Sequence, residues 1–233
     1  MANFGALTDH WGLTAALKPL VDIAEVVASS KIPQSNSRAD AEDESGDIAD
    51  AAWHGNDDGL QFDTSVTYAI KSGTLDLSDL ALGQLDTGKV ITSIEVSTSN
   101  GAWPQVTVAG VLGCGALEQD KAYDLPAVNV LGQKKAQLIG VAVTTGRLTD
   151  CSLSASCDFA QQEDGEGEPV AWGVSGAIAS ASATAVAVTA EAPELAAAAG
   201  WAEVQDTGVD EPQAAWHTAS ITVEDVLDVT ITE

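Results

Sequence analysis

Apolar and polar residues alternate with a period of two along most of the chain from residue 62 onward. Val66, Tyr68 and Ile70 share one parity, and residues 179–190 alternate very small side chains. Successive side chains of a strand point to opposite faces, so this period predicts β-strands with one buried face. We therefore expect a mainly β protein, an antiparallel β-sandwich or barrel-like domain with one or two short helices and an N-terminal arm.

The same pattern sets the expected elements. Leucine and valine recur at three- and four-residue steps over residues 8–30, which predicts a partly helical arm over 1–34 and a single β-sandwich domain over 35–233. A short helix is expected between Ser78 and Gly83, and another at 194–199 with Gly200 as its C-cap. Strands are expected at 62–70, 89–98, 102–112, 136–145, 148–160, 168–178, 180–190, 214–223 and 226–232.

One hairpin can be placed in register from the sequence, around residues 99–101. A two-residue turn would pair apolar with polar residues, whereas a three-residue loop with Gly101 in the left-handed conformation pairs Ile94 with Val106. The longer loop is therefore expected. Pro104 has no N–H to donate, so this end of the strand is predicted to lie at a sheet edge or rim.

Charge is one-sided: 9 Lys and Arg face 35 Asp and Glu, a formal net charge of −26. Residues 148–233 hold 16 carboxylates and no basic residue, and residues 36–58 hold eight carboxylates with Arg38. Such a chain is repelled by nucleic-acid phosphates and by anionic lipid, which argues against a nucleic-acid reader and a membrane-surface protein. Solubility, a salt-rich habitat and repulsion of another polyanion all explain this charge, and the sequence leaves the three open.

Signatures of catalysis are missing from the sequence. His54 and His217 lack the spacing of a paired-histidine metal site, and there is no nucleophile elbow or phosphate-binding loop. Cys151 and Cys157 share one face of a predicted strand too far apart to bond, so they are expected to be small buried residues. We expect no enzyme activity, cofactor or metal. No stretch reaches 18 uninterrupted apolar residues, and no basic leader precedes an apolar segment, so neither a membrane span nor a secretory signal is expected.

Three groups of residues occur in an order that is familiar from one protein family. An acidic segment at 37–48 follows the arm, the hairpin 94–108 comes next, and residues 153–159 lead through an acidic turn into 170–176. In this order the chain resembles the major tail tube proteins of tailed bacteriophages. The resemblance implies a β-sandwich subunit with a flanking helix that forms hexameric rings, which stack into a hollow tube for DNA passage.

The resemblance also implies partners and sites. The partners are copies of the chain itself and other tail proteins; DNA passes without specific binding, no membrane is involved, and the protein belongs to the virion tail, assembled in the host cytoplasm. Candidate inter-subunit contacts are Phe4, Trp11, Leu13 and Trp103, and candidate acidic lumen or loop residues are Asp40, Glu42, Asp43, Glu44, Glu163, Asp164 and Glu166.

Two other functions stay open at this point. One is another phage particle component, such as a baseplate or hub ring, a decoration protein or a fibre domain. The other is a cellular β-sandwich binding module.

Overall fold

The computed structural model describes residues 26–31, 37–42, 48–54, 62–86, 89–112, 120–163, 169–201, 203–210 and 216–232. Over these residues the chain is almost entirely β-strand, and the helical structure among them is one turn of 3-10 helix, η2 (Leu77–Asp79). All strand pairs are antiparallel. The mainly β, antiparallel fold predicted from the alternation is thus confirmed.

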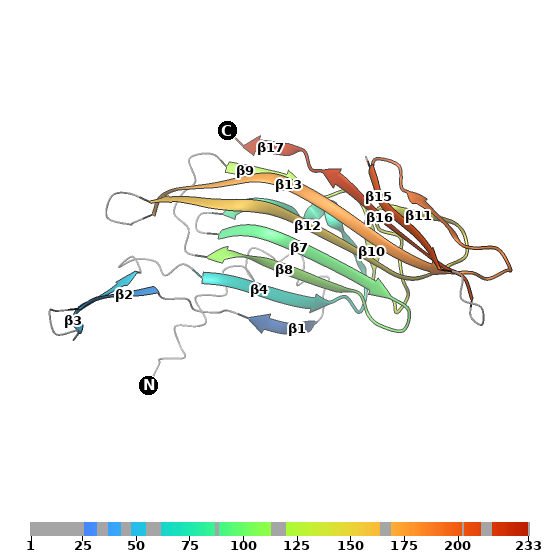
Figure 1. The fold of residues 1–233 in the computed structure, drawn as a ribbon, viewed down its shortest axis with the longest axis horizontal. Helices are drawn as coiled ribbons and strands as arrows, with labels where there is room; N and C mark the ends of the chain where they lie inside the picture. Colours follow the sequence, from blue (N-terminus) through green and yellow to red (C-terminus); the bar gives the residue numbers. More distant parts are fainter. Residues whose placement is uncertain are drawn as a thin grey trace.

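The main sheet follows the order β1-β4-β8-β7-β12-β13-β16-β15, and its long strands run along the longest axis of the molecule (Figure 1). The sheet stays open, since no pairing joins β1 to β15 among the described residues. Its strands are β1 (Val26–Lys31), β4 (Phe62–Ala69), β7 (Lys89–Ser99), β8 (Gln105–Leu112), β12 (Arg147–Glu163), β13 (Pro169–Val186), β15 (Glu203–Asp210) and β16 (Thr218–Val226).

The sheet forks near the start of β7. β12 pairs with β7 from Asp150 to Ser156 and then continues beside β13. β6 takes its place beside the first residues of β7 and is extended by β9 and β17. At the fork the buried Cys157 Sγ lies 3.6 Å from the Ile91 carbonyl oxygen. The bounds of the branch are β6 (Ala81–Asp86), β9 (Asp120–Asp124) and β17 (Val229–Thr232).

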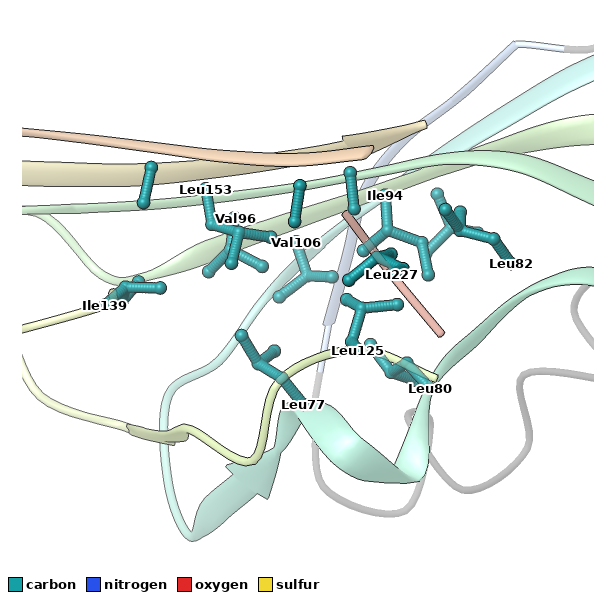
Figure 2. Close-up of a cluster of buried hydrophobic side chains, with 14 of the residues drawn as sticks. Leu77, Leu80, Leu82, Ile94, Val96, Val106, Leu125, Ile139, Leu153 and Leu227 are labelled. Carbon is teal, nitrogen blue, oxygen red and sulfur yellow. The ribbon is translucent and has the colours of Figure 1, made fainter. Parts of the chain in front are cut away.

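A second layer covers one face of the main sheet and gives the domain its sandwich-like form. Figure 2 shows Leu77, Leu80 and Leu125 of this layer lying opposite Ile94 and Val106 of the sheet. All five side chains are buried. The layer consists of η2, the pair β5 (Thr74–Asp76) and β10 (Asn129–Leu131), and the pair β11 (Val141–Thr145) and β14 (Glu194–Ala197); β2 (Ser37–Glu42) and β3 (Ile48–His54) pair as a separate hairpin.

Burial along β12 alternates as the period of two predicts. Cys151, Leu153, Ala155 and Cys157 are buried, and the residues between them are exposed or half-buried. Both cysteines are free thiols on the core face, which confirms that they are small buried residues and not a disulfide.

The β7–β8 hairpin keeps the predicted faces but not the predicted register. Ile94 pairs with Val108, two residues further along than the expected Val106. A shift of two preserves side-chain parity, so apolar residues still face apolar residues. The loop is longer because Pro104 leaves the ladder, and its carbonyl oxygen accepts a hydrogen bond from the Ile70 N–H at 2.9 Å.

The predictions of a helix at 194–199 and of another between Ser78 and Gly83 are wrong. Residues 194–197 form strand β14, whose register with β11 and the 3.0 Å bond from Glu194 N–H to Thr145 Oγ1 outweigh the helix propensity of an alanine-rich run. Gly200 has φ +98° in the turn that follows and caps no helix. The helix expected between Ser78 and Gly83 is replaced by the single turn η2 and strand β6.

The structure also changes the bounds of two predicted segments, the strands at 168–190 and the N-terminal arm. The strands expected at 168–178 and 180–190 are one continuous strand, β13, paired on both sides. Within the arm expected at 1–34, residues 26–31 form β1 and pair with β4 instead of continuing a helix. Residues 1–25 lie outside the described residues.

Candidate assembly surfaces

Short polar side chains cover the face of the main sheet that points away from the core. Strand register aligns them in rows across six strands, and every member is exposed or half-buried. Neighbouring strands lie about 4.8 Å apart, so a row spans roughly 24 Å. We call this surface the polar face; one row joins Thr67, Thr107, Glu95, Ser154, Ser180 and Glu224, and the next joins Ala69, Gln105, Ser97, Ser152, Ser182 and Thr222.

Cross-strand hydroxyl pairs link neighbouring strands on this surface. The Oγ1 atoms of Thr67 and Thr107 lie 2.9 Å apart, and so do the Oγ atoms of Ser152 and Ser182. The charges in the two rows are carboxylates, and the rows contain no cation. A surface of this kind is well hydrated and has no group that would hold a polyanion.

The two outer strands of the main sheet leave backbone edges available. Among the described residues, no strand pairs with the outer edge of β1 or of β15. Unpaired N–H and C=O groups along a strand edge can pair with a strand of another chain. Both edges therefore suit pairing with a neighbouring subunit.

Four cations and two exposed leucines gather at one end of the molecule, where β7 turns into β8 (Figure 1). Leu131 and Leu138 are 42% and 49% exposed, and Lys134, Lys135 and Arg147 are exposed. Lys71 lies near them because a hydrogen bond connects the segment after β4 to the 132–138 loop. In this bond the Gly132 N–H donates to the Gly73 carbonyl oxygen at 2.9 Å. We call this surface the basic end, made of Lys71, Trp103, Leu131, Lys134, Lys135, Leu138 and Arg147.

Hydrogen bonds from Asn100 connect the loops of the basic end. Its backbone N–H donates to the Thr149 carbonyl oxygen at 3.1 Å, and its Nδ2 donates to that of Leu148 at 2.8 Å. Its Oδ1 accepts the Ala136 N–H at 3.3 Å. One side chain thus joins the β7–β8 turn, the 132–138 loop and the start of β12.

Trp103 is half-buried within this surface. The Nζ atom of Lys134 lies 5.2 Å from the centroid of the Trp103 ring, within range of a cation–π contact. The Gly101 N–H donates to the Lys134 carbonyl oxygen at 3.2 Å, and Gly101 has φ +90°, the left-handed conformation that the sequence predicted. The turn therefore sets the positions of both Trp103 and Lys134.

Comparison with models of protein families gave no match, and comparison with curated proteins gave none either. Within the described ranges, no three His, Cys, Asp or Glu side chains are grouped so that they could hold a metal ion. The part of the chain that the structure describes also contains no helix long and apolar enough to cross a membrane.

The candidate residues named from the sequence are spread over the molecule. Trp103 belongs to the basic end, Asp40 and Glu42 lie on β2, and Glu163 is the last residue of β12. The structure does not bring Trp103 together with these acids, because β12 runs away from the basic end towards the other end of the molecule (Figure 1). Phe4, Trp11, Leu13, Asp43, Glu44, Asp164 and Glu166 lie outside the described residues.

Sequence reasoning missed both surfaces. The polar face has a readable signal, since serine or threonine recurs at alternate positions over 152–156 and 180–184. The basic end has a fainter one: residues 96–117 and 125–149 contain no Asp or Glu, although the whole chain has 35. Lys71, Trp103 and Arg147 are far apart in sequence, so only the fold brings them together.

We expect Gln137→Leu to destabilise the protein by about 2 kcal/mol. Gln137 is 9% exposed; its Nε2 donates to the Leu131 carbonyl oxygen at 2.7 Å, and its Oε1 accepts the Leu131 N–H at 2.6 Å. Leucine would leave both backbone groups of Leu131 without these partners. Urea unfolding measures the loss, with Gln133→Leu in the same loop as the control, expected to change stability by less than about 0.5 kcal/mol. Equal stability of the two variants would contradict the prediction.

Proposed function

We propose that the protein is a virion structural protein, a tail tube subunit that assembles with its own copies into stacked rings around a channel for DNA. The observation that supports this most is the polar face, a cation-free surface about 24 Å wide on an open sheet. Here the two rows offer hydroxyls, an amide, carboxylates and Ala69, and the exposed Ile178 and Val226 pair beside them on the same face.

The chemistry of a DNA channel requires such a wall. Duplex DNA carries one negative charge per about 1.7 Å of its axis, so lysine or arginine on the wall would bind it and slow its passage. Short hydroxyl side chains keep the wall smooth, and Glu95 and Glu224 repel phosphate. In this proposal the polar face lines the channel.

Assembly of such subunits has to overcome repulsion between copies that each carry a net charge of −26. Strand pairing through the edges of β1 and β15 is one source of attraction, and burial of exposed apolar side chains is another. The proposed partners are copies of the chain and other tail proteins, and the proposed location is the virion tail, assembled in the host cytoplasm.

Electron microscopy of the purified protein tests the proposal. Negatively stained samples over a range of protein and salt concentrations are expected to contain rings or tubes with a central channel. Added salt should favour them, because it screens repulsion between the acidic subunits. Monomers or small closed oligomers at every condition would instead favour a decoration protein or a binding module, and a rise in melting temperature with a sugar or peptide would identify the latter.

A further inference from the structure

The basic end holds a larger share of the positive charge than any other part of this acidic chain that the structure describes. Its four cations are nearly half of the nine in the chain, so the remaining sequence has five cations against 35 carboxylates. The segments that build most of it, 96–117 and 125–149, contain no acid. Within the described residues, none of the four cations forms an ion pair. These cations are therefore available to an anionic partner.

The surface also has the composition of a protein interface. Leu131 and Leu138 are exposed beside the half-buried ring of Trp103. Interface cores are enriched in aromatic and apolar residues and depleted of lysine and acids alike, and cations at the rim select an acidic partner. Nucleic-acid binding is disfavoured instead, because the net charge of −26 repels phosphate.

The opposite end of the molecule supplies the complementary charge. β12 ends there at Glu163, and the β2–β3 hairpin, which carries Asp40, Glu42 and Asp50 against the single cation Arg38, extends at the same end (Figure 1). Asp158 is an exposed carboxylate further back on β12. The two ends lie on opposite sides of the molecule along its long axis (Figure 1), so a contact between them joins copies head to tail.

We propose that the basic end binds the carboxylate-rich end of a second copy, which holds each ring on the next. This contact rests on the proposed function and identifies the surface that stacks the rings. A head-to-tail interface between unlike surfaces does not close on itself, so it extends into an open fibre or tube. Pairing within a ring through β1 and β15 is a separate contact, which predicts that the two can be disrupted independently.

Charge reversal tests the contact. Lys134→Glu/Lys135→Glu is expected to raise the concentration needed for tube formation by about tenfold or more, or to leave single rings that do not stack. Lys134→Arg/Lys135→Arg keeps the positive charge at the same two positions and is expected to leave tubes unchanged. Sedimentation velocity and negative-stain microscopy measure both, and thermal unfolding checks that each variant folds.

A second variant guards against a folding defect, because Lys134 also contacts the Trp103 ring. Lys135→Glu/Arg147→Glu preserves that contact and is expected to have the same effect on stacking. Adding Asp158→Lys/Glu163→Lys to Lys134→Glu/Lys135→Glu exchanges the charges of the two ends and is expected to restore tubes.

The outcomes separate the two proposals. Wild-type protein that never forms rings or tubes would overturn the proposed function and this contact together. Tubes formed by Lys134→Glu/Lys135→Glu at the wild-type concentration would overturn the contact alone, and so would a failure of the exchanged charges to restore them. Fluorescence anisotropy with duplex DNA is the last test: binding by the wild type that these two substitutions abolish would show a nucleic-acid partner and also overturn the contact.

Discussion

Gly110→Ala is expected to destabilise the protein by about 3 kcal/mol or more, because a methyl group there meets backbone atoms. Gly110 lies on β8 between β4 and β7, and an added Cβ would clash with the Val90 carbonyl oxygen. The ladder shifts register between Ile91 and Ser93, beside this position. The three strands would have to separate to admit the methyl group, which opens the middle of the core.

Gly173→Ala is the matched control for this substitution. Gly173 lies on β13 of the same sheet, is exposed, and has nothing within 4 Å of an added Cβ. Alanine there is expected to be neutral or to stabilise by about 0.5 kcal/mol, since glycine is unfavourable within a strand. Thermal unfolding followed by circular dichroism should give a melting temperature lower by about 6–12 °C for Gly110→Ala alone. Matching melting curves for the two variants would show that β7 and β8 are further apart than described.

Stability is expected to fall steeply as the pH rises from 9 to 12. Burial raises the pKa of Cys151 and of Cys157 from 9.0 to about 11, and that of Tyr68 from 10.0 to about 12. Below pH 9 these groups are protonated in both states. At higher pH they ionise first in the unfolded chain, which lowers its free energy until the folded pKa is passed. One pKa unit is about 1.4 kcal/mol, so each group removes up to about 2.7 kcal/mol.

Variants of Cys151, Cys157 and Tyr68 show how much of the stability lost at high pH comes from the thiols and how much from the tyrosine. Cys151→Ala/Cys157→Ala is expected to lose about 4 kcal/mol less than the wild type between pH 9 and 11, measured by urea unfolding at each pH. Tyr68→Phe should reduce the loss between pH 10 and 12. It should also be neutral or stabilising at pH 7, because the buried Tyr68 hydroxyl has no hydrogen-bond partner among the described residues. An unchanged slope in the cysteine variant would mean that the thiols ionise as freely in the folded protein as in the unfolded chain.

The candidate surfaces show where reasoning from sequence stops. Alternation puts Ser152 and Ser154 on the face opposite Cys151, but it did not reveal that Ser154 lies in one continuous row with Thr67 and Glu224. The rows require six strands in one order, and that order depends on pairings such as Glu95 with Ser154, which lie 59 positions apart in the chain. The basic end has the same origin, because Lys71, Trp103 and Arg147 come from separate loops.

The sequence alone determined the strand content, the inward and outward faces of most strands, the buried free thiols of Cys151 and Cys157, and the acidity of the chain. These properties are local or additive: side-chain parity repeats every two residues, and charge is a sum. Tertiary structure decided the rest. It set the Ile94–Val108 register, turned the alanine-rich 194–197 into a strand, and divided the sheet at Cys157. Each of these depends on which strand lies alongside, and a polypeptide finds that neighbour by packing its core and closing its loops, not by its local pattern.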